Sequence, residues 1–348
     1  MTSMEQPATT PNSLTHRWRW IVVAVTIVGA VIGAAIIFTR GDGESTTTQG
    51  VTTTLHVDGS PNGIAAVPHG LWVGLTGRVG DLNGALTHLD LVTGEVDKRI
   101  PLHGVPSFIR PIGDSLWLDN ASTWTDTASG ELIRFDPRSG TVQARRRFKQ
   151  PTFDFAELDG RVWTLVGRNP ATVVPLDPKT MKTIGSPITI SPSRVISVVS
   201  DGGVLWATAA EANKLLRIDP KTRRVTSVSV GEFPVGVVFA DGSVWVANRS
   251  AGTVTKVDPS TMRVTKTIHV GELPTWMTAA DGSVWVASQH DGTVDRIDAR
   301  TGEKVGDPIR IAPASGSDAA AHIPTAGDGA VWVTSLTQRT VSRIDPRR

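Results

Sequence analysis

The chain has 348 residues, of which 39% are hydrophobic and 20% charged, with a formal net charge of +2 and no cysteine. This composition indicates a folded body with a sizeable core, because disorder requires low hydrophobicity and high net charge. The lack of cysteine excludes disulfides, thiolate-bound metals, thiol nucleophiles and an acylated-cysteine lipid anchor. Basic and acidic residues balance beyond residue 40, which argues against a nucleic-acid partner.

The first element in chain order is an apolar run over residues 21–38 that contains no charged residue. As a helix it spans about 30 Å with its flanks, the thickness of a bilayer core, so residues 19–39 are predicted to form one transmembrane helix. A cleaved signal peptide is the alternative, although the run is long for a signal sequence and no Ala-x-Ala site follows it. Two arginines precede the run, so residues 1–18 are expected in the cytoplasm and the chain beyond the helix outside it. Residues 40–50, rich in Thr and Gly, are expected to form a flexible linker.

After residue 50 the sequence repeats one unit seven times, and residues 231–270 and 271–311 align almost without gaps. Each unit alternates short runs rich in Val, Ile and Thr with turn signals, which is typical of four antiparallel strands. In the fifth unit the strands are predicted at 235–240, 243–248, 253–258 and 263–270. A tryptophan in the second strand recurs at Trp72, Trp117, Trp163, Trp206, Trp245, Trp285 and Trp332. An aspartate closing the third strand recurs at Asp90, Asp136, Asp177, Asp219, Asp258, Asp298 and Asp345. The pattern predicts an all-β fold, a seven-bladed β-propeller over residues 51–348 preceded by one transmembrane helix.

The last unit contains three strands and lacks a fourth. Residues 51–57, VTTTLHV, match the outermost strand of the fifth unit, VTKTIHV at 264–270. We therefore expect residues 51–57 to complete the last blade and close the ring, which leaves no open sheet edge.

The recurring residues are interpreted as structural. A tryptophan between apolar neighbours suits packing between blades better than stacking on a sugar or base. The aspartates, often followed by proline, suit turns, and calcium binding is the rival interpretation, although no copy has an EF-hand array. Motifs of metalloproteases, serine hydrolases and nucleotide-binding loops are absent from the sequence, so no metal, no other cofactor and no catalytic residue is predicted.

Function is expected where the copies differ, on the loops that join strand four to strand one and strand two to strand three. Both loop sets should emerge on one face, around a central tunnel where propellers usually bind ligands. The positions two residues after the proline that opens a blade are expected at the tunnel mouth. The candidate ligand-binding residues are Phe108, Trp124, Asp126, Phe153, Arg168, Arg194, Glu211, Arg249, Trp276, His290, Asp291, His322 and Arg339. A solvated rim of mixed charge is the competing interpretation.

Two further features stand out in the sequence. His290, Asp291 and His322 come from neighbouring blades and form the best candidate for a catalytic cluster, but their spacing carries no motif. A basic run, Arg145–Arg147 with Lys149, falls on the outermost strand of the second blade. It is interpreted first as protection of a strand edge and second as a surface for anionic headgroups or wall polymer.

The segment PVGVVFADGSVWVANRSAGTVTKVDPSTMRVTKTIHVGELP, residues 234–274, resembles the YVTN/YncE-like β-propeller repeats. More distantly, the repeats resemble the propellers of streptogramin (virginiamycin B) lyases. The resemblance covers about residues 51–348 and implies the fold more than the function, because such repeats occur in sensors, binding domains and enzymes. The lyases use a histidine, a Glu-x-His pair and magnesium. This sequence has no Glu-x-His, so His290 and His322 are not assigned as catalytic residues.

The sequence thus predicts a bacterial, single-pass membrane protein whose propeller is extracellular or periplasmic. The propeller is expected to bind an unknown small molecule or an envelope protein through its variable face, without catalysis. A lyase-like or lactonase-like enzyme and a structural envelope scaffold are the alternatives.

Overall fold

The computed structural model describes residues 50–347 apart from 69, 77–82, 122–128, 169, 191–193 and 315–320. These residues belong to one compact unit that begins at Gly43. The predicted transmembrane helix and the segment before it lie outside the described residues, as does the predicted linker except for Gly50. Within the described residues, no helix is long and apolar enough to cross a membrane.

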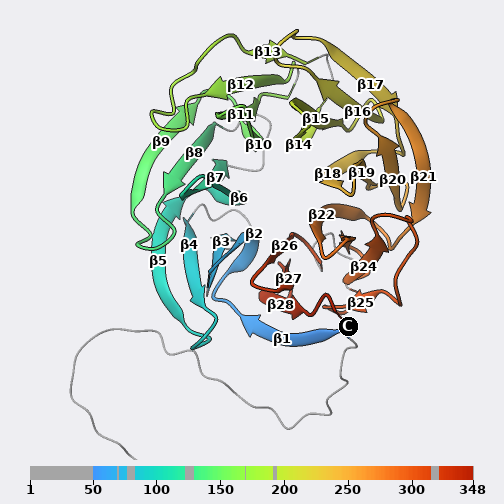
Figure 1. Ribbon diagram of the computed structural model, residues 1–348. Coiled ribbons are helices and arrows are strands. Elements are labelled where there is room, and N and C mark those ends of the chain that lie inside the picture. The colour runs from blue at the N-terminus through green and yellow to red at the C-terminus, as the bar shows by residue number, and fades with distance from the viewer. Residues whose placement is uncertain are drawn as a thin grey trace, which may run out of the picture. The chain divides into compact units, whose positions relative to one another are not determined.

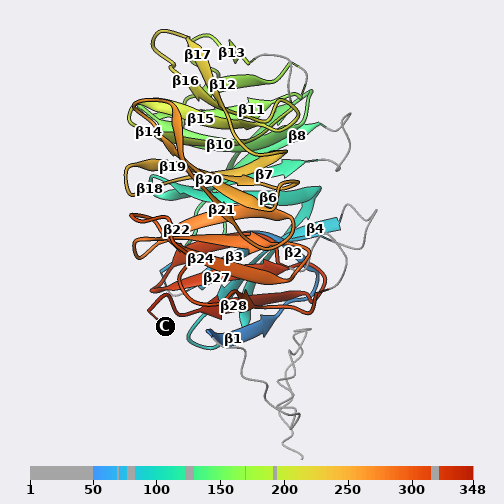
Figure 2. The ribbon, with the colours of Figure 1, turned by 90° about the vertical axis from the view of Figure 1, so that its right-hand side faces the viewer.

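Seven four-stranded antiparallel sheets surround a central axis, with one strand of each sheet innermost (Figure 1). Turned by 90°, the blades are seen edge on, one above another (Figure 2). The described chain is therefore an all-β, seven-bladed propeller, as the repeats predict.

The first four blades use consecutive strands, from the axis outward. They are β2 (Ser60–Val67), β3 (Gly70–Thr76), β4 (Asn83–Asp90) and β5 (Val96–His103); β6 (Val105–Ile112), β7 (Ser115–Ala121), β8 (Gly130–Phe135) and β9 (Val142–Phe148); β10 (Thr152–Leu158), β11 (Arg161–Val166), β12 (Thr172–Leu176) and β13 (Ile188–Thr189); and β14 (Val195–Asp201), β15 (Val204–Ala209), β16 (Lys214–Ile218) and β17 (Val225–Ser229).

The last three blades follow the same plan except at the outer edge of the seventh. They are β18 (Pro234–Ala240), β19 (Ser243–Asn248), β20 (Thr253–Asp258) and β21 (Arg263–His269); β22 (Pro274–Ala280), β23 (Ser283–Ser288), β24 (Thr293–Asp298) and β25 (Ile309–Arg310); and β26 (Pro324–Gly327), β27 (Ala330–Ser335), β28 (Thr340–Ile344) and β1 (Val51–His56).

The outermost strand of the seventh blade comes from the other end of the repeat region. β1 pairs antiparallel with β28, with Leu55 opposite Val341. The Arg343 guanidinium also donates a hydrogen bond to the Thr52 hydroxyl at 3.0 Å. The backbone N–H of Val57, just beyond the strand, donates to the carbonyl of Arg339 at 2.9 Å. Backbone pairing of β1 with β28 closes the ring, so β28 is not left as an open edge of the seventh blade.

The recurring tryptophans fill the interior. Trp245 has no exposed surface and packs with Val284 and Val286 of the next blade. Its indole N–H donates to the carbonyl of Ala240 at 3.2 Å, and the Lys256 ammonium lies 5.1 Å from its ring centroid. A ring so enclosed cannot stack on a ligand, and its burial stabilises the contact between blades.

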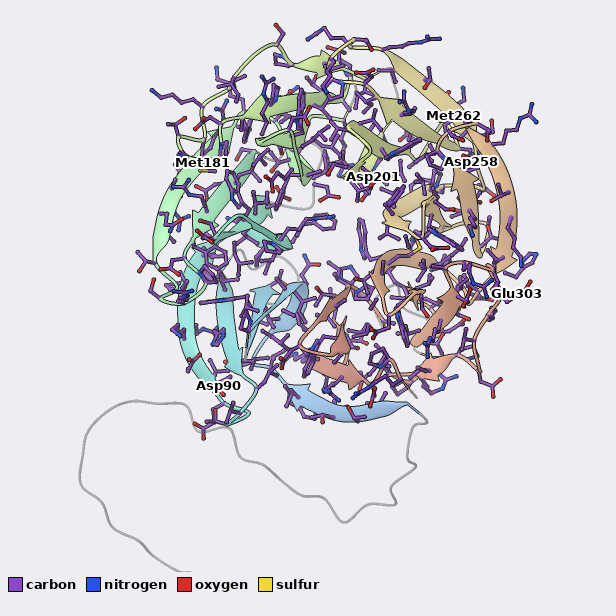
Figure 3. All side chains as sticks on the ribbon, viewed as in Figure 1. Asp90, Met181, Asp201, Asp258, Met262 and Glu303 are labelled. Carbon is purple, nitrogen blue, oxygen red and sulfur yellow. The ribbon has the colours of Figure 1, made fainter. Side chains whose placement is uncertain are left out.

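The recurring aspartates cap their own turns. One Asp258 carboxylate oxygen accepts backbone N–H bonds from Ser260 at 2.8 Å and Thr261 at 3.3 Å. The Ser260 hydroxyl also donates to this oxygen at 2.7 Å, and this bond, followed by the backbone bonds, lowers the pKa of Asp258 to about 2. Met262, the fifth residue of the turn, adopts a left-handed backbone with φ 55°. Figure 3 shows Asp258 and Met262 away from the central opening. The aspartates therefore act as turn residues, as the sequence predicts.

Candidate functional site

Two sets of loops lie together on one face of the ring. The loop after β15 donates a backbone hydrogen bond from Ala210 to the carbonyl of Arg194, in the segment leading into β14, at 2.8 Å. The same bond recurs in the fifth blade, from Arg249 to Phe233, at 2.9 Å. In these blades, the loop between strands two and three is thus hydrogen-bonded to the loop that leads into the first strand of the same blade. This is the face on which the variable residues were expected.

A cavity of about 350 Å³ occupies the centre of the ring, between the inner strands β2, β6, β14, β18, β22 and β26. Side chains of these strands point into the central opening (Figure 3). Most of the lining residues have apolar side chains, among them Phe108, Phe239 and Trp276, but polar and apolar atoms share the exposed surface of the cavity about equally. Among the described residues that line the cavity, Arg110 is the only one with a charged side chain. A cavity of this size, with aromatic rings and polar groups in its lining, is large enough for a small molecule.

Arg110 is held by a buried carboxylate. Its guanidinium lies 3.0 Å from Asp154, which has no exposed surface. The Asp154 carboxylate also accepts hydrogen bonds from the backbone N–H of Phe155 at 2.8 Å, the Ser197 hydroxyl at 2.8 Å and the N–H of Val198 at 3.0 Å. Burial raises the pKa of Asp154, and the Arg110 charge and these donors oppose the rise. The cluster joins the second, third and fourth blades.

A second buried carboxyl lies behind this pair. Asp119 of β7, 2% exposed, accepts a hydrogen bond from the Thr152 hydroxyl of β10. Burial raises the pKa of Asp119 to about 7, the Asp154 charge adds to the rise, and the Thr152 bond opposes it. Such a pKa suits proton transfer, but Asp119 is not among the residues that line the cavity.

Two aromatic rings narrow the cavity. The ring centroids of Phe108 and Trp276 lie 4.7 Å apart with an interplanar angle of 81°, an edge-to-face contact. Phe108 belongs to the second blade and Trp276 to the sixth, and these blades are not neighbours. The contact therefore bridges part of the opening, and both rings keep some exposed surface. Their placement at the tunnel agrees with the sequence-based expectation.

The other two residues expected at the tunnel mouth lie elsewhere. The Phe153 ring packs under the Arg168 guanidinium, 4.9 Å from its centroid, and Arg194 lies 5.9 Å from the centroid of Phe233. Neither Phe153 nor Arg194 is among the residues that line the cavity.

The difference has its cause in strand register. In the fifth blade, Pro234 pairs with the residue three positions after the blade tryptophan. The residue with the same pairing is Thr152 in the third blade and Val195 in the fourth. Counting from the nearby prolines therefore selected the wrong residue as the one facing the tunnel in the third and fourth blades. Two residues after these strand starts stand Asp154 and Ser197, the two members of the polar cluster behind Arg110.

Sequence comparison between the copies carried a signal for this cluster. Asp119 stands two residues after its tryptophan, where the fifth and sixth blades have Ala247 and Ala287. Asp154 likewise stands where the fifth blade has Gly236. A carboxylate inside an apolar strand requires a partner. Comparison of the repeat units therefore predicts that Asp119 and Asp154 have polar partners, whereas only the assembled propeller shows which residues these partners are.

The predicted cluster of His290, Asp291 and His322 forms differently. His290 Nδ1 bonds to the Glu272 carboxylate, and one Asp291 oxygen accepts the backbone N–H of Glu272 at 2.7 Å. Ligand atoms of Glu272, His290 and Asp291 lie within 4.8 Å of one another, a spacing that could hold a metal ion. His322 is not in this group. Burial lowers the pKa of His322 to about 4, against a hydrogen bond to the backbone of Asn62 that raises it.

The remaining candidates are scattered. Glu211 and Arg339 are exposed, and Arg249 is half-buried on the loop after β19. Trp124 and Asp126 lie outside the described residues. The variable face therefore does not gather all its predicted residues into one site.

The basic run lies on β9, the outer strand of the second blade. The guanidinium groups of Arg145 and Arg147 lie 3.0 and 3.3 Å from the Glu131 carboxylate. Arg146 points the other way and donates to the Thr183 hydroxyl at 2.7 Å. All three arginines thus have hydrogen-bond partners within the propeller, but Glu131 is the only one of these partners that carries a negative charge, so the strand keeps a net positive charge.

Comparison with known proteins supports the fold. No protein family model matches the chain, and neither does any curated protein sequence. Among solved structures, a virginiamycin B lyase from Staphylococcus aureus matches with a TM-score of 0.67 and 14% identity, over 84% of this chain and 98% of that one. A chain of the Mitotic Checkpoint Complex matches with a TM-score of 0.69 and 11% identity, over 92% and 98%. The computationally designed Ika8 protein matches with a TM-score of 0.59 and 12% identity, over 85% and 99%. At these identities the likeness is one of fold alone.

Proposed function

We propose that this chain is a membrane-anchored, extracytoplasmic propeller that binds a small molecule in its central tunnel without transforming it. The observation that carries the proposal is the 350 Å³ cavity, which combines aromatic rings, hydroxyl groups and one charged side chain among its described lining residues. The hydrogen bonds of Asp119 and Asp154 engage their carboxylates inside the blades. This arrangement favours binding over acid–base catalysis, which needs a carboxyl within reach of the substrate.

The anchor is proposed from the sequence. Residues 19–39 form the single transmembrane helix, residues 1–18 the cytoplasmic segment and residues 40–50 the linker, with the propeller extracellular or periplasmic. The repeats support a relationship to YVTN/YncE-like propellers. Protease added outside intact cells should then degrade residues 51–348, and their protection would contradict this topology.

The variable loop face offers a second kind of contact, with an envelope protein. No nucleic acid, metal or other cofactor is part of the proposal. A structural envelope scaffold, the remaining non-catalytic alternative, would need no ligand in the tunnel.

One observation favours an enzyme as the second candidate. Glu272, His290 and Asp291 place three ligand atoms within 4.8 Å on the loop face, and the fold is similar to that of a virginiamycin B lyase. Each of the three groups already has a partner within the loops, so their contacts also hold the loop after β23 against the loop that leads into β22. Binding in the tunnel remains the function that we propose.

Filling the tunnel tests the proposal. The full-length protein in lipid nanodiscs is incubated with a small-molecule cell extract, washed, and its retained compounds identified by mass spectrometry. Thr278→Trp places an indole in the cavity and should abolish retention. Val264→Trp, at an exposed valine on the outer strand β21, is the matched control and should leave retention intact. Retention that is equal in all three proteins, or absent in all, would contradict binding in the tunnel.

A further inference from the structure

We propose that the tunnel binds an organic anion with one acidic group and a planar apolar body, and that Arg110 binds the acidic group. The inference rests on the proposed function, because it names the ligand class of the same tunnel. Its starting point is an asymmetry in the Arg110–Asp154 pair. The Asp154 side chain has no exposed surface, whereas the Arg110 side chain is 34% exposed. The cavity therefore meets the cation of the pair and not the anion.

The hydrogen bonds of the pair point the same way. Asp154 accepts from Phe155, Ser197 and Val198 in addition to Arg110, so its oxygens are occupied. A guanidinium has several N–H donors in a planar fork that matches a carboxylate, a sulfonate or a phosphate. Part of that fork is taken by Asp154, and part remains on the exposed side. Arg110 thus offers donors to the cavity from a fixed position, with Asp154 as its positioning residue.

The charge of the cluster limits the ligand to one acidic group. Arg110 and Asp154 together are neutral when both are ionised, so attraction to an anion comes from short charge-assisted hydrogen bonds. Among the described lining residues there is no second cation to hold a second acidic group. The further charges of a polyanion would be desolvated in the cavity without a cation to pair with, which is costly.

The walls select the body of the ligand. Phe108 and Trp276 meet edge to face, and Phe239 also lines the cavity. The Arg110 guanidinium lies 5.7 Å from the Phe108 ring centroid, so the anion-binding group and the aromatic wall are adjacent. A planar apolar body can stack on the exposed ring surface while its acidic group reaches Arg110.

Two probes that differ only in charge test the inference. The full-length protein in nanodiscs is titrated with 2-naphthoate and with its neutral isostere 2-naphthamide, with empty nanodiscs as the reference, and affinities are measured by calorimetry. We expect the wild-type protein to bind naphthoate about tenfold more tightly or better, from the usual worth of a charge-assisted hydrogen bond. Arg110→Gln should abolish the preference by weakening naphthoate binding alone.

Two further variants keep the test decisive. Arg110→Gln leaves Asp154 buried without a cation and can destabilise the fold. The double variant Arg110→Gln/Asp154→Asn removes both charges and should also lose the preference. Its Asn amide nitrogen cannot accept the bond that one Asp154 oxygen accepts, so it should melt below the wild type but above Arg110→Gln, which leaves a buried charge unpaired. Arg99→Gln removes an exposed arginine of β5 and should change neither affinity.

The outcomes separate this inference from the proposed function. Equal affinity for both probes, with both weakened by Thr278→Trp, would overturn the anion inference and leave binding in the tunnel intact. A naphthoate preference that persists without Arg110 would overturn the role of Arg110. Equal binding of octanoate would overturn the planar body. Failure of both naphthyl probes to bind would overturn the inference outright, whereas the proposed function fails only by its own retention test.

Discussion

Replacing Asp119 with Asn should stabilise the propeller at neutral and alkaline pH. Asp119 is 2% exposed, and burial raises its pKa from 3.8 to about 7. At about 1.4 kcal/mol per pKa unit, ionisation of Asp119 above pH 7 costs the folded state about 4 kcal/mol relative to the protonated acid. Asn keeps the shape and neutrality of that acid, and its Oδ1 can still accept the bond from Thr152. The gain in unfolding free energy should thus be absent near pH 4 and grow to a few kcal/mol by pH 8.

The sign of this effect follows from proton linkage. Between about pH 4 and pH 7 the folded state holds a proton on Asp119 that the unfolded chain has lost, so stability from this group falls as pH rises. His322 acts in the opposite direction. Burial lowers its pKa to about 4 from 6.5, so the unfolded chain binds a proton that the folded state does not. Stability from His322 therefore rises between about pH 4 and pH 6.5.

The two slopes nearly cancel in the wild-type protein. Each amounts to about 1.4 kcal/mol per pH unit over the shared range. We expect Asp119→Asn to expose the rise due to His322, about 3 kcal/mol in total, and His322→Gln to expose the fall due to Asp119. The double variant should show neither slope, which makes it the control for both.

Urea unfolding of the full-length protein, followed by tryptophan fluorescence from about pH 4.5 to pH 8, measures these profiles. The quantity to compare is the unfolding free energy of each variant minus that of the wild type at the same pH. A gain from Asp119→Asn that is equal at pH 4.5 and pH 8 would show that the carboxyl does not titrate in this range and would refute the reasoning.

Three further outcomes are expected. Deleting β1 exposes the edge of β28, so the shortened protein should melt lower or aggregate; an unchanged melting temperature would mean that the ring closes elsewhere. Asp258→Ala removes the acceptor of the turn and should lower the melting temperature more than Asp258→Asn, which can still accept; equal losses would argue against the turn interpretation. EDTA should not change the melting curve, and lactones and cyclic depsipeptides should not turn over; turnover that His290→Ala abolishes would favour the enzyme.

The blade architecture could be predicted because its determinants are local and repeat. Alternation with period two and turn residues at fixed offsets mark each strand, and the strands expected in the fifth blade differ from β18 and β21 by one residue at one end. The match between residues 51–57 and an outermost strand predicted the pairing of β1 with β28. In each case the information lies within one repeat or in a comparison of two repeats.

The tunnel site depends on contacts that no single repeat contains. Arg110, Asp154 and Ser197 belong to three blades and lie 44 and 43 residues apart in pairs, so their contact exists only in the closed ring. The strand irregularity near the start of six of the seven inner strands also shifts the count of residues. A local sequence pattern cannot supply either fact.

The position occupied by Asp154, two residues after the inner-strand residue that pairs three positions beyond the blade tryptophan, shows how the tunnel can vary while the blades stay constant. In the fifth blade it is Gly236, where an added Cβ would lie 2.2 Å from the carbonyl of Thr275 in the next blade. Where the position carries a side chain instead, as in Asp154, that side chain bonds to the next blade and holds Arg110 at the cavity. Because the tryptophan packing lies further out along each blade, such changes alter the chemistry of the tunnel with little effect on the core. Phe108, Ser197, Gly236 and Trp276, which occupy this position in four of the blades, all line the cavity, so the residue at this position sets the chemistry of the tunnel.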